Sequence, residues 1–137
     1  MHGLHLTADL RGCDAARSVM LDPATLRETC LAAVRHASLQ PVGELFHRFT
    51  PALGADALAP VGITGVVLLA ESHLAVHTWP EIAAVTLDVY VCNLDTDNSA
   101  KANALLAMLI DAFAPAQVER HALQRGALQG NRPELHR

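Results

Sequence analysis

Two periods of hydrophobic and polar residues recur along the chain, and each predicts its own kind of secondary structure. Alternation with period two, or a short continuous apolar run bounded by turn residues, predicts strands. Six segments follow one of these patterns: 3–12, 41–49, 62–70, 73–79, 83–93 and 117–126. Apolar residues spaced three and four apart predict helices over 22–36 and 100–113. Asp22 and Pro23 supply the expected helix start, because aspartate caps helix ends and proline fits the first turn.

The predicted elements come in the order strand, helix, four strands, helix, strand. This order predicts an α+β domain, a two-layer α/β sandwich with two helices on one face of a mainly antiparallel sheet. Such a domain leaves the other sheet face open, and a second copy packed sheet against sheet would cover it. We assign residues 1–126 to a single domain and residues 127–137 to a flexible tail.

Composition narrows the class of protein. The 137 residues suit one core, and a hydrophobic share of 51% is high for a small domain, which favours further burial in an oligomer. The formal net charge of −4 gives no basic footprint, so nucleic acid is not an expected partner. No apolar run reaches the roughly 18 residues of a membrane span, and no secretion signal is recognisable at the start. We therefore expect a cytoplasmic protein without membrane contact.

The cysteines and histidines do not indicate a metal site. The three cysteines, Cys13, Cys30 and Cys92, are widely spaced and contain no CxxC pair. Cys13 and Cys30 are predicted to be small buried hydrophobic residues. The histidines show no zinc-type spacing with the cysteines, so we predict no bound metal.

The stretch ESHLAVHTWPE, residues 71–81, concentrates reactive groups between two almost wholly apolar segments. Glu71 and Ser72 are predicted to lie at the corner of a hairpin. A serine hydroxyl at a strained corner can attack the preceding carbonyl, which converts the peptide bond into an ester. A base that removes the serine α-proton then breaks the ester, and hydrolysis leaves a pyruvoyl group and ammonia. That ketone can bind an amine substrate and act as an electron sink for decarboxylation.

Such chemistry needs a base, a further hydroxyl and an acid near the corner. His77 lies five residues past Ser72 and would face the opposite side of a regular strand, although a corner relaxes that alternation. Thr64 offers a hydroxyl on the preceding apolar strand, and Cys92 ends the following strand as a candidate acid. From these residues alone, self-processing is one of several interpretations.

The chain resembles the prokaryotic S-adenosylmethionine decarboxylases, pyruvoyl-dependent enzymes of polyamine synthesis. Five segments carry the resemblance: GITGVVLLAESHLAVHTWPE, the later LDVYVC, the initial GLHLTADLRGCD, FHRF at 46–49, and the closing strand that ends in Arg125-Gly126. It extends over most of residues 3–126, and the ESHLxxHTWPE pattern is highly specific. The resemblance implies a two-layer α/β sandwich and decarboxylation of S-adenosylmethionine to the aminopropyl donor for spermidine synthesis.

The resemblance also implies a role for several residues of this chain. Cleavage would fall between Glu71 and Ser72, giving a β chain of residues 1–71 and an α chain of residues 72–137. Ser72 would become the covalent pyruvoyl cofactor and His77 would be the processing base. Thr64 would assist processing through its hydroxyl, and Cys92 would protonate the decarboxylated carbon.

Three more residues match positions that hold the substrate in the family. Glu81 would bind the ribose hydroxyls, Phe49 would stack on adenine, and Asp9 would line the pocket where relatives usually carry glutamate. The smallest family members are dimers with sites at the interface, so we expect a homodimer of processed chains.

The chain also departs from the family pattern. The link over 52–61 is longer by roughly nine residues, which can shift Phe49 against the pocket. Asn93 follows Cys92 where the family usually has glycine, and threonine replaces serine at position 64. Aromatic residues make up only 4% of the chain, which is few for an adenosyl pocket.

Two alternative functions therefore stay open: a pyruvoyl-dependent ornithine or arginine decarboxylase, and a regulatory homologue that no longer cleaves itself. No acidic cluster marks a site for putrescine or a metal as activator.

Overall fold

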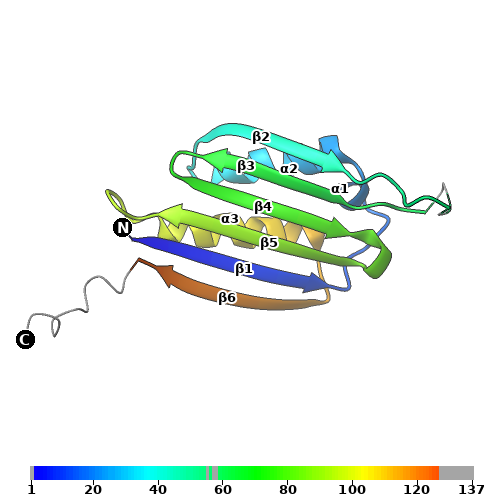
Figure 1. Ribbon diagram of the computed structural model, residues 1–137. Coiled ribbons are helices and arrows are strands. Elements are labelled where there is room, and N and C mark those ends of the chain that lie inside the picture. Colours follow the sequence, from blue (N-terminus) through cyan, green and yellow to red (C-terminus); the bar gives the residue numbers. More distant parts are fainter. Residues whose placement is uncertain (1, 55, 57–58, 127–137) are drawn as a thin grey trace, which may run out of the picture.

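The computed structural model describes residues 2–54, 56 and 59–126 of the chain (Figure 1). Its elements are β1 (Gly3–Arg11), α1 (Ser18–Leu21), α2 (Pro23–His36), β2 (Pro41–Arg48), β3 (Ile63–Leu69), β4 (Ser72–Trp79), the 3-10 helix η1 (Pro80–Ile82), β5 (Ala84–Cys92), α3 (Ser99–Phe113) and β6 (Gln117–Arg125). All predicted strands and both predicted helices are present, and each of their ends lies within one residue of the predicted position. The predicted tail at 127–137 lies outside the described residues.

The strands form one sheet in the order β2-β3-β4-β5-β1-β6, and every neighbouring pair is antiparallel. The helices α2 and α3 lie together on one face of this sheet (Figure 1). This arrangement confirms the predicted α+β class and the two-layer sandwich. Strand β1 lies between β5 and β6 although more than seventy residues separate it from either, so the first and the last strand are neighbours in the sheet.

The core lies between the sheet and the helices because each strand presents alternate side chains to the helical layer. In β1 and β5 the buried positions are every second residue, among them Leu6 and Leu87. The helices contribute their apolar stripes, for example Leu105 and Leu109 of α3. Cys30 of α2 is fully buried there, and burial raises the pKa of its thiol to about 12.

The start of α2 follows the sequence prediction. The Asp22 carboxylate accepts hydrogen bonds from the backbone N–H groups of Ala24 and Thr25 and from the Thr25 hydroxyl, and Pro23 is the first helical residue. The sequence did not predict α1 or η1. Each has fewer than five residues, which is too short for a helical period to be recognised.

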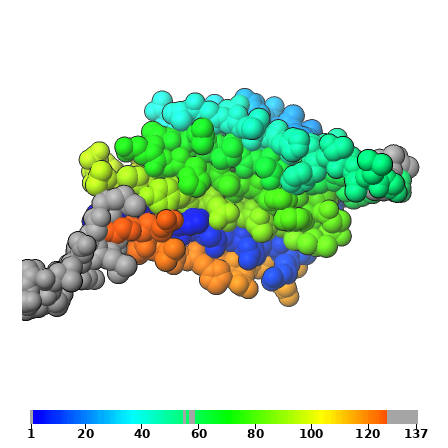
Figure 2. All heavy atoms as spheres, in the orientation of Figure 1, coloured from blue at the N-terminus to red at the C-terminus, as the bar shows by residue number. Residues whose placement is uncertain are grey.

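The sheet face opposite the helices is not covered by any of the described elements (Figure 2). We call it the open face; it carries side chains of all six strands, including Leu45, Leu68 and Leu123, which are strongly exposed. Apolar side chains at such positions are typical of a surface that packs against another molecule. Among the described residues, none of the helices has the length and apolar character needed to cross a membrane.

Candidate active site

The turn that joins β3 to β4 holds Glu71 in a strained conformation. Leu69 pairs with Ser72 across the hairpin, so only Ala70 and Glu71 make the turn. Glu71 has a φ of 58°, in the left-handed region that favours glycine. The predicted strained corner is therefore present, and its peptide bond to Ser72 is the bond expected to break.

Ser72 and Cys92 are brought together at this end of the sheet. The backbone N–H of Cys92 donates a hydrogen bond of 3.1 Å to the Ser72 hydroxyl oxygen. The contact joins the first residue of β4 to the last residue of β5, which is its antiparallel neighbour. It fixes the hydroxyl next to the turn and places it against the backbone of Cys92, whose side chain is half-exposed.

A second group of candidate residues forms one row across the open face. In register, Thr64 of β3 pairs with His77 of β4, His77 with Thr86 of β5, and Thr86 with Asp9 of β1. We call these four residues the His77 row. Directly paired residues of antiparallel strands point to the same face, so their side chains lie side by side. The hydroxyl oxygen of Thr64 is 3.0 Å from Nδ1 of His77 and forms a hydrogen bond with it.

Two aromatic side chains flank the imidazole of His77. The Trp79 ring stacks on it with a centroid distance of 3.8 Å and an angle of 8° between planes, while Phe49 lies at 5.1 Å and 38°. Phe49 lies close to His77 although the link over 52–61 is long. The backbone N–H of Phe49 donates a hydrogen bond to the carbonyl of Gly62, which follows the link, so the two ends of the link are held together. Both rings keep part of their surface exposed, which leaves room for a stacking ligand.

The environment of His77 favours a neutral imidazole with one unused nitrogen. Burial lowers the pKa of His77 below its ordinary value of 6.5, and the negative charge of Glu81 opposes part of that shift. Nδ1 is bonded to Thr64, whereas Nε2 is buried and has no hydrogen-bond partner among the described residues. A neutral histidine with a free nitrogen can act as a general base when the group that loses the proton comes within reach of that nitrogen.

Two shallow hollows lie on the open face on either side of Thr86. One, of about 290 Å³, is lined by residues that include Thr64, His77, Thr86 and Asp88. The other, of about 250 Å³, is lined by residues that include Asp9, Trp79, Ile82 and Thr86. Asp9 and Phe49, predicted as substrate ligands, are therefore both near His77, and Glu81 is close enough to influence its charge.

Sequence reasoning missed Thr86 and the stack of Trp79 on His77. Alternation along 83–93 places Thr86 on the open face, but only the pairing between strands puts it opposite His77. The stack could have been inferred from the two-residue spacing of His77 and Trp79, because residues two apart in a strand lie on the same face.

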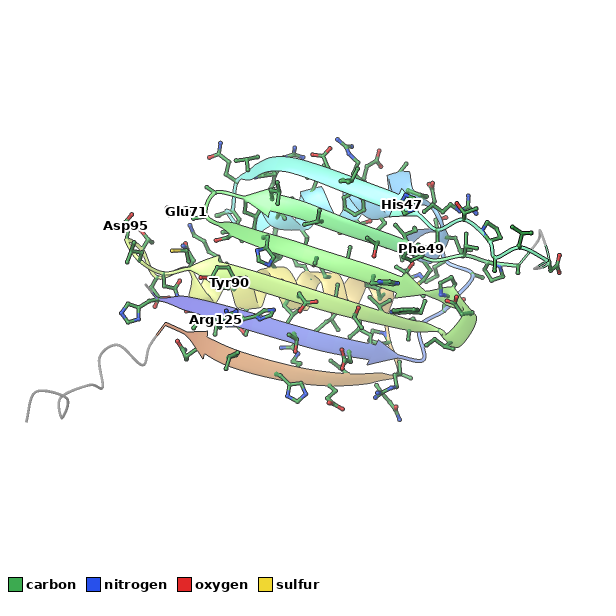
Figure 3. The ribbon with its side chains drawn as sticks, in the orientation of Figure 1. His47, Phe49, Glu71, Tyr90, Asp95 and Arg125 are labelled. Carbon is green, nitrogen blue, oxygen red and sulfur yellow. The ribbon has the colours of Figure 1, made fainter. Side chains whose placement is uncertain are left out.

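The structure separates Ser72 from His77 within one chain. They lie at opposite ends of β4, and five residues of extended strand span about 16 Å. Figure 3 shows Glu71 at one end of the sheet and Phe49, the neighbour of His77, at the other. The corner does not relax the alternation, because the turn ends at Glu71 and Ser72 is already part of the strand. A single described chain therefore holds two half-sites: the Ser72–Cys92 pair and the His77 row.

Removing the strain at Glu71 should slow cleavage and stabilise the uncleaved chain. We expect Glu71→Gly, made in the Ser72→Ala background, to raise the free energy of unfolding by about 1 kcal/mol, because glycine adopts positive φ without strain. The same change with Ser72 intact should slow self-cleavage, since less strain is released at the corner. Denaturant melts measure the first effect, and mass spectra taken over time after synthesis measure the second. Glu71→Ala retains the strain and serves as the control for loss of the carboxylate.

The fold and the two half-sites together define a class: small α+β domains with a strained Glu-Ser corner at one end of an antiparallel sheet. Comparison with known proteins identifies the family. The profile of the S-adenosylmethionine decarboxylase family matches residues 4–126, so the chain belongs to that family.

Individual relatives agree with this assignment. The S-adenosylmethionine decarboxylase proenzyme of Aquifex aeolicus is 35% identical over 127 residues, which cover 93% of this chain and 83% of the relative. The proenzyme of Archaeoglobus fulgidus is 32% identical over 124 residues, or 90% and 97% of the two chains. The crystal structure of the Aquifex aeolicus adenosylmethionine decarboxylase superposes with a TM-score of 0.75 at 34% identity and covers 90% of each chain.

Proposed function

We propose that this chain decarboxylates S-adenosylmethionine after cutting itself between Glu71 and Ser72, and so supplies the aminopropyl donor for spermidine synthesis. The observation that carries the proposal is the strained Glu71 next to a serine whose hydroxyl is held by Cys92. Family membership and the name "S-adenosylmethionine decarboxylase proenzyme" of the relatives support the substrate and the self-processing. The predicted cytoplasmic location stays a prediction.

The two alternative functions are less well supported. The relatives compared above are named for S-adenosylmethionine, so ornithine or arginine as the substrate is not favoured. A homologue that no longer processes would not need a strained turn, a held serine and an imidazole with an unused nitrogen, yet this chain has all three.

Cleavage would proceed through the side chain of Ser72. Its hydroxyl oxygen attacks the carbonyl carbon of Glu71, the C–N bond breaks, and an ester with a free Ser72 amine results. A base then takes the Ser72 α-proton, the Glu71 carboxylate leaves, and water replaces the resulting imine nitrogen as ammonia. The residues fit the pyruvoyl group that this leaves at position 72, because the half-exposed Cys92 lies beside it. Such a group supplies an electron sink for loss of CO2 from a bound amine.

The base required for this step is too far away within the same chain, and we propose that a second copy supplies it. In this dimer, two open faces would pack about a two-fold axis, and the end of one sheet that carries Ser72 would approach the end of the other that carries His77. Each site would then take Ser72 and Cys92 from one chain and Thr64 and His77 from its partner. The buried Nε2 of His77 and the exposed leucines of the open face support this homodimer, because neither has a partner among the described residues.

The remaining residues of the His77 end would bind the substrate. The Glu81 carboxylate can accept hydrogen bonds from both ribose hydroxyls, and the exposed part of the Phe49 ring can stack on adenine. Asp9 lines the neighbouring hollow and can attract the positively charged sulfonium. The Cys92 thiol would donate the proton that replaces CO2 on the substrate carbon.

The experiment that tests the proposal is the intact mass of the purified protein under denaturing conditions. We expect two chains divided between residues 71 and 72, the second beginning with a ketone instead of an amine, and release of CO2 from labelled S-adenosylmethionine. A single stable chain of 14.6 kDa would contradict self-processing. Cleaved chains that release CO2 from ornithine or arginine only would contradict the substrate.

Self-cleavage should depend on pH through His77. A protonated imidazole cannot accept the α-proton, so we expect a constant rate above pH 6.5 and a falling rate as the pH drops through the lowered pKa of His77. Trp79→Ala exposes the ring, so the pKa should rise toward 6.5 and the fall should begin at a higher pH. Cleavage followed by mass spectrometry in a series of buffers gives both profiles. Identical profiles for the two proteins would contradict this role of burial.

A further inference from the structure

Asn98, which precedes α3, does not use its side chain in the usual way. An asparagine at this position of a helix normally accepts a hydrogen bond from a backbone N–H of the first turn. The side chain of Asn98 makes no such bond. Its amide Nδ2 instead donates a hydrogen bond of 2.8 Å to the backbone carbonyl of Cys92. The Asp97 carboxylate accepts the N–H of Ser99 at 2.9 Å, so the helix start has another acceptor.

The hydrogen bond from Asn98 to the Cys92 carbonyl is one of three that hold the backbone on both sides of Cys92. The N–H of Cys92 is bonded to the Ser72 hydroxyl at 3.1 Å, and its carbonyl is bonded to Asn98. The next N–H, that of Asn93, donates to the carbonyl of His2 at 2.8 Å. These bonds fix the peptide units before and after Cys92 and so fix the direction of its Cα–Cβ bond. The thiol can then occupy only the few positions that its side-chain rotamers allow.

Asn93 holds Asn98 in place. Its Oδ1 accepts the backbone N–H of Asn98 at 2.7 Å, and its Nδ2 donates to the Ser99 hydroxyl oxygen at 3.1 Å. These two bonds close the loop between β5 and α3. A glycine at this position, as the family usually has, would provide neither bond. The departure from the family pattern is thus directly linked to the position of Cys92.

We propose that Asn98, with the support of Asn93, is a positioning residue for the Cys92 thiol. The inference rests on the proposed function, in which that thiol protonates the substrate carbon. Proton transfer depends steeply on geometry, and a displacement of about 1 Å can cost a hundredfold in rate. Conversion of Ser72 to the pyruvoyl group removes its hydroxyl, whereas the bond from the Asn93 N–H to the His2 carbonyl remains. We therefore expect loss of the Asn98 bond to lower kcat about tenfold and to leave KM unchanged.

Asn98→Asp and Asn98→Ser separate this role from helix capping. Both residues are good helix caps, so the melting temperature should stay the same or rise. An ionised aspartate has no proton to donate to the Cys92 carbonyl, and the serine side chain is one atom shorter than the amide. Activity per cleaved chain, with cleaved chains counted by mass, should therefore fall while stability does not.

A second measurement does not depend on activity. Cys13 and Cys30 are buried, whereas Cys92 is partly exposed, so iodoacetamide should modify Cys92 first. In Asn98→Ser, where no new charge affects the thiol, alkylation of Cys92 should be about threefold faster, because the thiol is no longer held in one direction. The matched controls are Asn103→Asp and Asn103→Ser; the Asn103 amide donates to the Ser99 carbonyl at 2.9 Å in the same helix. The controls should match the wild type in both measurements.

Unchanged kcat and unchanged alkylation in both Asn98 variants would overturn the inference. A fall in kcat that only parallels a fall in melting temperature would also overturn it, since that outcome indicates a structural role. If the wild-type chain does not cleave, the proposed function fails, and the alkylation rates of uncleaved chains still decide whether Asn98 holds Cys92.

Discussion

Replacing Ser72 by alanine should leave the chain whole and abolish decarboxylation. Alanine has no hydroxyl, so no atom at position 72 can attack the Glu71 carbonyl, and neither the ester nor the pyruvoyl group can form. The stability of the fold should change little, because among the described residues the Ser72 hydroxyl accepts only the hydrogen bond from the Cys92 N–H, where β4 begins and β5 ends. The loss of that bond costs about 1 kcal/mol. The expected mass spectrum contains one chain, and no CO2 is released from S-adenosylmethionine.

The matched control is Ser18→Ala, which removes an exposed serine at the start of α1. It should cleave at the wild-type rate. Cleavage of the Ser72→Ala chain at the same bond would mean that another nucleophile or a contaminating protease acts there, and the self-processing mechanism would be wrong.

Self-cleavage should be restored when two variants that cannot cleave alone are made in the same cell. Ser72→Ala lacks the nucleophile and His77→Ala lacks the base, so neither should cleave when made alone. In a mixed dimer, Ser72 of the His77→Ala chain faces the intact His77 of the partner subunit, and that site is complete. Random pairing makes about half of the dimers mixed, and each has one working site, so about a quarter of all chains should be cleaved.

The masses identify which chain is cut. Only the His77→Ala chain should yield fragments, since the other chain has no Ser72. If each site were formed within one chain, no mixture of these variants would cleave, and the shared site would be excluded. His36→Ala provides the control, because His36 is exposed on α2, away from the open face, and this variant should cleave without help.

The fold was largely predictable because its determinants are local. Alternation with period two or a continuous apolar run identified every strand, and the Asp22-Pro23 pair located the start of α2 to the residue. The short helix α1 has only four residues, and its buried Met20 gives no repeating pattern to detect. The order of strands in the sheet was not predicted, because it depends on pairing between segments such as β1 and β6 that lie far apart in sequence.

The site was predictable in part. The motif identified Ser72 and His77, and the strand pattern placed Cys92 near Ser72, as the structure confirms. The separation of Ser72 and His77 was missed, because sequence spacing gives a distance along one chain and carries no information on a second copy. The bond from Asn98 to Cys92 was not predicted, because it depends on the path of the loop from β5.

The order of the strands determines how the two pieces made by the proposed cleavage stay together. Residues 1–71 contain β1, β2 and β3, and residues 72–137 contain β4, β5 and β6. Because β1 lies between β5 and β6, and β4 lies between β3 and β5, the two pieces are interleaved. Each piece is held by backbone ladders to the other, so neither can leave while the sheet is intact. Once unfolded, however, the pieces must find each other by diffusion, and recovery becomes dependent on concentration. The proposed cleavage would thus convert a single chain into two pieces whose reassembly after unfolding depends on their concentration.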